Sequence, residues 1–191
     1  MIERKVQITV VQGNIVKQSD CDAIVNSANE NLRAGSGVCG AIYRAAGPEL
    51  ERCSIQFAPL ALGQAVATTA FNLPNKFIIH TRGPKYFFDE EPAENLASAI
   101  RNTLLVAEKH GIARIAVPAI SMGIFKYPAA EAIPILVKSA RATASQLEHL
   151  REVRFVVLEE ALFMLFSNEV QRNKGYVHSE VGTHGSHFIA H

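Results

Sequence analysis

The residues best suited to chemistry lie in one glycine-rich segment, residues 26–47, with the sequence NSANENLRAGSGVCGAIYRAAG. A short apolar run at residues 23–25 precedes it and predicts a buried strand. The segment then passes through Gly35, Ser36 and Gly37 before a predicted helix starts near Val38. Backbone N–H groups and the positive end of the helix dipole converge at such a junction, and glycine allows close approach of an anion. The pattern predicts a phosphate site.

The same glycines also fit the G-x-G-x-x-G pattern of dinucleotide-binding folds, at Gly35, Gly37 and Gly40. That kind of site requires an acidic residue about 20 positions further on, which holds a ribose hydroxyl. The chain has no Asp or Glu between Glu51 and Asp89. We therefore exclude a nicotinamide-dependent dehydrogenase.

A second loop of small residues, 118–128, follows the apolar run at residues 115–117. Its Ala-Ile-Ser-Met-Gly tract, residues 119–123, superficially resembles the nucleophile elbow of a serine hydrolase. Such an enzyme requires an acid, usually Asp, and then a His later in the chain. No Asp follows Asp89, and His149, expected near the end of a helix, has no obvious acidic partner in the sequence. We interpret the tract as a tight turn that admits a ligand.

The hydrophobic pattern predicts six strands that alternate with five helices. The expected strands cover residues 5–11, 23–25, 65–70, 77–81, 115–117 and 154–158, and the expected helices cover residues 38–47, 48–56, 93–110, 129–147 and 160–170. Residues 83–92, with two prolines and an acidic run, are expected to form a surface loop. Alternating strands and helices indicate an α/β fold with a largely parallel sheet covered on both faces.

Composition limits the classes of protein further. At 191 residues, with 48% hydrophobic and 19% charged side chains, the chain is large enough for one globular domain with a full core. We expect that domain over residues 1–170 and a flexible Gly- and His-rich tail over residues 171–191. A net charge of +1 argues against a nucleic-acid or membrane surface. Three cysteines without metal-ligand spacing predict reduced thiols, a cytoplasmic location and no metal site.

Five blocks of sequence, in order, resemble the macrodomain family of ADP-ribose-binding modules. The blocks are residues 12–15 (QGNI), 22–29 (DAIVNSAN), 35–47, 80–84 and 118–128. The resemblance covers roughly residues 5–170 and is greatest to the branch that includes the MacroD-type hydrolases. It implies a three-layer α/β/α fold, with a mixed six-stranded sheet between helices and a ligand cleft at the crest of the sheet.

The resemblance also implies which residues bind the ligand. Two loops would clasp the two phosphates. Their residues are Gly35, Ser36, Gly37 and Val38 in the first loop, and Ser121, Met122, Gly123, Ile124 and Phe125 in the second. Asn29 would contact the distal ribose, on which Phe125 would also pack. Asn14 and Ile15 would lie beside the adenine. The implied partner is ADP-ribose, free or attached to a protein, and no cofactor is implied.

Two positions depart from the family pattern. Asn14 stands where most members have an Asp that accepts from the adenine amine, so the bond loses its charge assistance. Cys39 stands where hydrolytic members have an Asp that helps to activate water. A thiol of ordinary pKa is mostly protonated at pH 7 and is a poor general base.

The prediction is therefore a macrodomain that binds ADP-ribose with weak or no hydrolysis. The alternative is an ADP-ribosyl hydrolase that acts on modified acidic side chains or on O-acetyl-ADP-ribose. Its candidate catalytic residues are Asn29 and Cys39.

Overall fold

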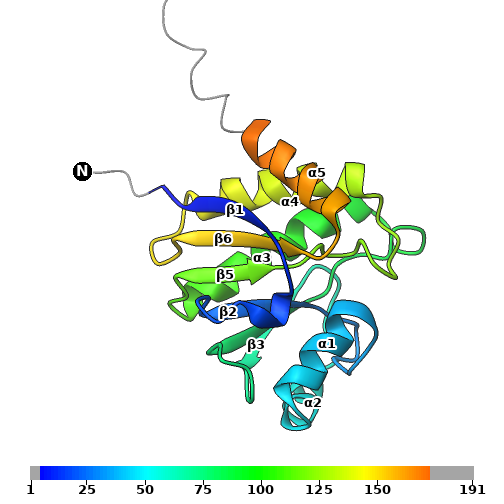
Figure 1. Ribbon diagram of the computed structural model, residues 1–191. Coiled ribbons are helices and arrows are strands. Elements are labelled where there is room, and N and C mark those ends of the chain that lie inside the picture. Colours follow the sequence, from blue (N-terminus) through cyan, green and yellow to red (C-terminus); the bar gives the residue numbers. More distant parts are fainter. Residues whose placement is uncertain (1–4, 173–191) are drawn as a thin grey trace, which may run out of the picture.

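The computed structural model describes residues 5–172, and its centre is a six-stranded sheet (Figure 1). The strands are β1 (Gln7–Gln12), β2 (Ala23–Ser27), β3 (Ala65–Thr69), β4 (Phe77–Thr81), β5 (Arg114–Val117) and β6 (Glu152–Val157). Their order across the sheet is β1-β6-β5-β2-β4-β3. Every neighbouring pair is parallel except β3 and β4, which are antiparallel. All six predicted strands are confirmed, and so is the mixed sheet.

Helices cover both faces of this sheet (Figure 1). They are α1 (Gly37–Ala46), α2 (Glu49–Ser54), α3 (Pro92–Lys109), α4 (Ala129–Ala144) and α5 (Glu160–Arg172), with short 3₁₀ turns η1 (Ile15–Lys17) and η2 (Ile55–Phe57). The predicted three-layer α/β/α fold is confirmed. The tail from residue 173 onward lies outside the described residues, so the boundary at residue 170 stays a prediction.

One predicted helix was too long at its C-terminal end. The apolar pattern extended α4 to residue 147, but the helix ends at Ala144. Beyond Ala144 the backbone hydrogen bonds span three residues instead of four. Gln146 N–H donates to the carbonyl of Thr143, and Leu147 N–H donates to the carbonyl of Ala144. Such i→i+3 bonds are typical of the tightened last turn of a helix.

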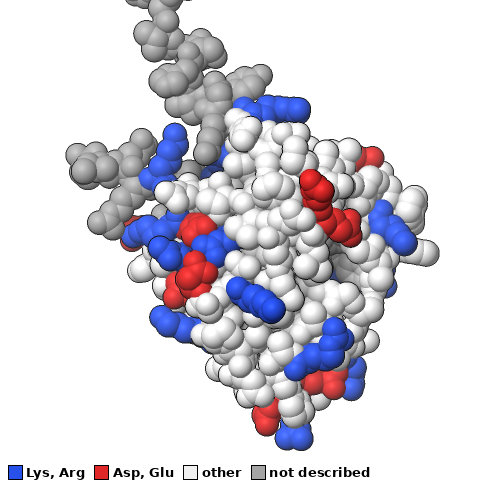
Figure 2. All heavy atoms as spheres, in the orientation of Figure 1, with Lys and Arg blue, Asp and Glu red and all other residues white. Residues whose placement is uncertain are grey.

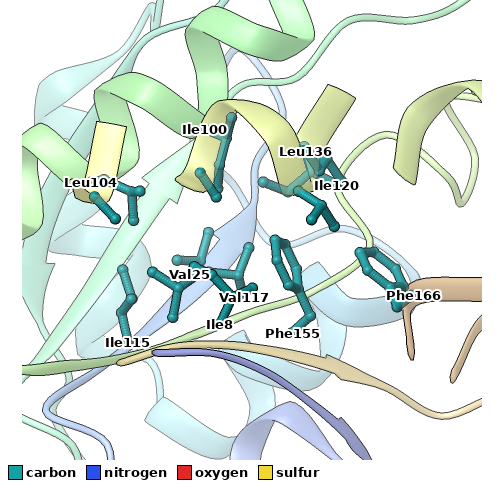
Figure 3. Close-up of a cluster of buried hydrophobic side chains, with 14 of the residues drawn as sticks. Ile8, Val25, Ile100, Leu104, Ile115, Val117, Ile120, Leu136, Phe155 and Phe166 are labelled. Carbon is teal, nitrogen blue, oxygen red and sulfur yellow. The ribbon is translucent and has the colours of Figure 1, made fainter. Parts of the chain in front are cut away.

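The larger part of the core lies between the sheet and helices α3, α4 and α5. Figure 3 shows strand side chains, among them Val25 of β2 and Phe155 of β6, pointing toward Ile100 of α3 and Leu136 of α4. Phe155 stacks on Phe166 of α5, with ring centroids 4.8 Å apart. Residues of the strands alternate between the two faces, as the pleat requires. This face therefore fixes the strands from which the loops of the site emerge.

The second face of the sheet packs against α1, α2 and η1. Strand residues that alternate with those of the first face, such as Ile24 and Val156, meet Ile42 of α1 and Leu50 of α2 there. Ile15 of η1 belongs to the same cluster. The glycine-rich segment is thus anchored by a helix whose apolar side is buried on the sheet.

Charged residues join the beginnings of β5 and β6 to the loop before β2. Arg154 donates to both carboxylate oxygens of Asp20 at 2.8 Å and to Glu152 at 2.9 Å. This hydrogen bonding by Arg154 lowers the pKa of Asp20 to about 2. Figure 2 shows acidic and basic side chains gathered together on the left of this face, with no large area of one sign.

Within residues 5–172, no helix has both the length and the apolar character needed to cross a bilayer.

Candidate functional site

The carboxyl ends of the parallel strands carry an open cleft, which is the usual position of ligand sites in such sheets. The cleft lies between the loop that enters α1 and the loop that follows β5, and its empty space of about 420 Å³ includes open solvent at its mouth. The lining residues are Ser27, Ser36, Val38, Ala119, Ser121, Gly123, Ile124 and Phe125. The two loops that the sequence singled out are therefore brought together, although they are about 80 residues apart in the chain.

The first wall of the cleft is the N-terminus of α1. Ser36 is the N-cap residue, but its side chain makes no capping hydrogen bond, and the first turn of the helix has no acidic residue. Gly37, the first helical residue, has a φ of +57°, which favours glycine. The helix dipole and the first N–H groups of α1 therefore face the cleft without an internal counter-charge, an arrangement that suits a phosphate.

Close packing fixes the glycine loop on this helix. A Cβ at Gly40 would collide with the carbonyl oxygen of Gly35. Gly40 N–H in turn donates to the carbonyl of Ser36 at 3.2 Å. Gly40 thus allows the loop to fold back over the start of α1, and any side chain at this position would displace the loop.

The second wall is a tight loop around Ser121. This residue has a φ of +65°, and its carbonyl accepts from Tyr127 N–H at 2.9 Å. Ser121 is 2% exposed, and its hydroxyl oxygen has no hydrogen-bond partner among the described residues. Buried hydroxyls are almost always hydrogen-bonded in folded proteins. A buried hydroxyl without a partner, in the lining of a cleft, indicates a place for a ligand oxygen.

Gly83, in the loop after β4, makes room for this serine. A Cβ at Gly83 would collide with Ser121 Oγ and would lie 2.6 Å from Cγ2 of Ile120.

Of the remaining residues of the second loop, Met122 is half-buried and packs against the main core, whereas Ile124 is 73% exposed. The side chain of Met122 is therefore directed to the core, and only its backbone is available to a phosphate.

Asn29 is oriented by its own loop. Its Nδ2 donates to the carbonyl of Arg33 at 2.8 Å, and its Oδ1 accepts from Arg33 N–H at 3.2 Å. An asparagine amide has two donor hydrogens and two acceptor lone pairs, so each atom retains capacity for a ligand. The amide also lies beside the glycine loop, because Nδ2 is 3.6 Å from where a Cβ on Gly35 would stand.

Cys39 lies in the first turn of α1 and is 7% exposed. Its thiol donates to the carbonyl of Arg33 at 3.5 Å. Burial raises the pKa of this thiol, although hydrogen bonds from the Asn26 side chain and the Gly35 backbone oppose the rise. Cys39 is therefore a neutral thiol at pH 7 and has little basicity with which to activate water.

A chain of buried polar groups runs beneath the cleft, and sequence reasoning gave it no role. Asn26 Nδ2 lies 3.1 Å from His80 Nδ1, and His80 Nε2 lies 3.0 Å from Thr68 Oγ1. The Thr68 hydroxyl donates to the carbonyl of Thr69, so it accepts from His80, which fixes the Nε2–H tautomer. Burial lowers the pKa of His80 to about 4, and the imidazole is neutral at pH 7.

The sequence did contain a signal for part of this chain. Asn26 and His80 each follow a run of apolar strand residues, at positions where an apolar residue would continue the strand. Ser27, which lines the cleft, comes directly after Asn26. Thr68 has no comparable signal, because Thr is common in strands.

Asn14 and Ile15 lie at the junction of β1 and η1. Asn14 is the N-cap residue of η1, and its Oδ1 accepts from Val16 N–H at 3.1 Å. Ile15 is 5% exposed and belongs to the same apolar cluster as Cys39 and Ile42. The cap uses one lone pair of the Asn14 oxygen. Contact of these two residues with an adenine stays a prediction.

Comparison with known proteins identifies the family. The family model of the Macro domain matches residues 25–136. An uncharacterized protein of Fusobacterium nucleatum is 39% identical over 166 residues, which are 86% of this chain and 95% of that protein. This chain belongs to the macrodomain family. The resemblance of the five sequence blocks is therefore confirmed.

Other macrodomains share both the sequence and the fold. The O-acetyl-ADP-ribose deacetylase of Salmonella typhimurium is 40% identical over 84% of this chain and 92% of its own length. The Oceanobacillus iheyensis macrodomain with ADP has a TM-score of 0.84 and 29% identity, over 92% of this chain and 96% of that chain. The Trypanosoma brucei macrodomain in complex with ADP-ribose has a TM-score of 0.79 and 30% identity, over 84% of this chain and 68% of that chain. The macrodomain fold of this chain is therefore shared with structures that hold adenine nucleotides.

Proposed function

We propose that this macrodomain binds ADP-ribose in the cleft between the glycine loop and the Ser121 loop, with weak or no hydrolysis. The observation that carries the proposal is the pair of phosphate-binding features that face each other there. The start of α1 has no acidic residue in its first turn, and the buried Ser121 hydroxyl has no partner within residues 5–172. Both features suit phosphate oxygens, which accept hydrogen bonds.

The residues of the site are assigned as the family resemblance implies. The two loops hold the two phosphates, Asn29 and Phe125 hold the distal ribose, and Asn14 and Ile15 lie beside the adenine. The ligand is free ADP-ribose or an ADP-ribosyl group on a protein. The cytoplasm is the compartment we propose, since Cys21, Cys39 and Cys53 are all free thiols. Nucleic acid is not a proposed ligand, because the net charge is +1 and charges of both signs are mixed on the face that Figure 2 shows.

Titration calorimetry with ADP-ribose and with AMP tests this proposal. We expect ADP-ribose to bind more tightly than AMP, because both loops address the second phosphate and the distal ribose, which AMP lacks. Equal affinities for the two ligands would contradict the assignment of the loops. As a matched pair of variants, Gly37→Glu places bulk and negative charge at the phosphate site and should abolish binding, whereas Glu49→Gln on α2 should leave it unchanged.

The second candidate function is hydrolysis of an ADP-ribosyl ester, such as O-acetyl-ADP-ribose. The observation that favours it is the 40% identity to a deacetylase of that substrate. The buried neutral thiol of Cys39 weighs against it, because no carboxylate stands there to accept a proton. A hydrolase with this site would have to place its water through Asn29 and the phosphates of the substrate itself.

A further inference from the structure

An aromatic turn stands beside the cleft and exposes two phenylalanines. The turn comprises residues 85–89, in the loop after β4, and Phe87 is 73% exposed while Phe88 is 87% exposed. Single exposed apolar residues are common on protein surfaces, whereas large ones that gather at a binding cleft are informative. Ile124, in the second loop of the cleft, is also 73% exposed. We call Phe87, Phe88 and Ile124 the apolar rim.

The turn is a built structure and not a loose loop. Lys85 N–H donates to the carboxylate of Asp89 at 2.7 Å, and Asp89 N–H donates back to the carbonyl of Lys85 at 3.0 Å. Tyr86 stacks against Tyr127 with ring centroids 4.9 Å apart, and its hydroxyl donates to Glu131 at 2.9 Å. These contacts hold the turn in a shape that keeps Phe87 and Phe88 in solvent.

The turn is also joined directly to the wall of the cleft. Tyr86 N–H donates to the carbonyl of Phe125 at 3.0 Å, and the ammonium group of Lys85 lies 5.7 Å from the centre of the Phe125 ring. Phe125 lines the cleft. A ligand held between the two loops is therefore close to the apolar rim, and a group attached to that ligand on this side can reach it.

We propose that the apolar rim is the docking surface for the polypeptide that carries the ADP-ribosyl group. This inference rests on the proposed function and adds to it the surface that meets a modified protein and a preference for apolar residues near the modified side chain. Main-chain and apolar side-chain atoms of the polypeptide cover Phe87 and Phe88, while the nucleotide fills the cleft. Free ADP-ribose leaves Phe87 and Phe88 exposed.

The charges beside the rim and its position favour a polypeptide over the other possible occupants. Asp89, Glu90 and Glu91 follow Phe88 directly, and two of them, Glu90 and Glu91, are exposed. An anionic membrane surface would be repelled by this run. A second copy of the chain, seated on the rim, would stand at the edge of the cleft and compete with any ligand attached to a protein.

The test uses fluorescence anisotropy competition with three probes. They are free ADP-ribose and two synthetic peptides of equal length, each with ADP-ribose joined to one side chain through a non-hydrolysable link. One peptide has Leu and Val beside the modified residue, and the other has Ser and Gly. We expect the protein to bind the apolar peptide on the order of tenfold more tightly than either other probe.

The variants Phe87→Ser/Phe88→Ser and Phe88→Ser should remove this preference and leave the affinity for free ADP-ribose unchanged. The matched control is Met164→Ser/Leu165→Ser, a second pair of adjacent exposed apolar residues, on α5, which should retain the preference. Phe88→Ser alone is included because Phe87 packs edge-on against Tyr86, at 5.0 Å between centroids.

Each other outcome overturns a defined statement. If free ADP-ribose binds but the three probes have equal affinity, the docking surface is wrong and the proposed function stands. If no probe binds, the proposed function itself fails. If sedimentation shows a dimer that Phe88→Ser converts to monomers, or if phosphatidylcholine vesicles capture the wild type and not the variant, the rim has a different occupant and the proposal fails.

Discussion

The side-chain amide of Asn26 donates a hydrogen bond to Nδ1 of His80 at 3.1 Å. The two residues are also direct partners in the pairing of β2 with β4. Both side chains are fully buried. The pair ties together the ends of the two strands from which the loops after β2 and β4 emerge. Asn26 also lies close enough to Cys39, at the start of α1, to lower the pKa of that thiol, so the same amide is adjacent to the glycine loop.

His80 should make the stability of the protein depend on pH. Burial lowers the pKa of His80 from 6.5 to about 4. Between these values the unfolded chain binds a proton that the folded protein does not, so the free energy of unfolding falls as the pH falls from 6.5 to 4. The full loss is about 3 kcal/mol. Urea unfolding at several pH values between 7 and 4.5 measures it.

The control for this prediction is His80→Gln, which removes the titrating group and keeps an amide for one of the two hydrogen bonds. The variant should be less stable than the wild type at pH 7 but should show a flatter profile down to pH 4.5. Asp20 loses its own contribution only at lower pH, since its pKa is lowered to about 2. Parallel profiles for the two proteins would show that His80 is not the group responsible.

Ser121→Ala should have opposite effects on stability and on binding. The substitution removes a buried hydroxyl that has no partner in the described part of the chain, so we expect the unliganded protein to gain about 1 kcal/mol of stability. The affinity for ADP-ribose should fall by roughly 5–10-fold, because the hydroxyl then cannot donate to a phosphate oxygen. Thermal unfolding and calorimetry on the same samples measure both effects.

Ser145→Ala serves as its control, because that exposed hydroxyl donates only within α4, to the carbonyl of Ala142. It should leave the affinity unchanged. A stability gain without a loss of affinity for Ser121→Ala would mean that the hydroxyl does not face the ligand.

Gly40→Ala should damage the glycine loop. The added methyl group collides with the carbonyl oxygen of Gly35, so the loop must move away from α1. Overpacking of this kind costs about 1–3 kcal/mol of stability, and we expect the affinity for ADP-ribose to fall at least about tenfold. Gly13→Ala is a suitable comparison, because its new methyl group would meet Val11 at an ordinary 3.6 Å. Equal behaviour of the two variants would argue against the close packing at Gly40.

Cys39→Asp should raise hydrolysis of O-acetyl-ADP-ribose above that of the wild type. A general base typically contributes about 10²–10⁴-fold, and the buried thiol of the wild type supplies little of it. Cys39→Asn has nearly the same shape without the charge and should stay as slow as the wild type. Release of acetate, followed over time, compares the three proteins. A fast wild type with no gain in Cys39→Asp would show that Cys39 has no part in the reaction.

Local sequence patterns predicted most of the fold correctly. The β-branched runs located all six strands, and the apolar stripe at Leu96, Ile100 and Leu104 located α3 to within one residue at each end. These features depend on neighbours within a few positions of the chain. The family resemblance, which rests on residues in the sequence, also predicted that the two loops lie on opposite sides of the cleft.

Local sequence patterns could not predict contacts between residues that are far apart in the chain. The bond between Asn26 and His80 depends on the register of two strands, and that between Arg154 and Asp20 joins residues 134 positions apart. The absence of a partner for Ser121 Oγ can be recognised only when the neighbouring atoms are in place. Periodicity describes which face of an element is apolar, and it carries no information on these pairings.

The strand order has a consequence for the synthesis of the protein. Within residues 5–172, β1 is an edge strand that pairs with β6 alone, and β6 begins at Glu152. β1 therefore leaves the ribosome well before β6, and it waits for β6 before it can be hydrogen-bonded in the sheet. Until then its polar backbone edge is open to other chains, and a chain released before residue 152 would retain that exposed edge. The synthesis of β6, and not that of β1, closes this sheet.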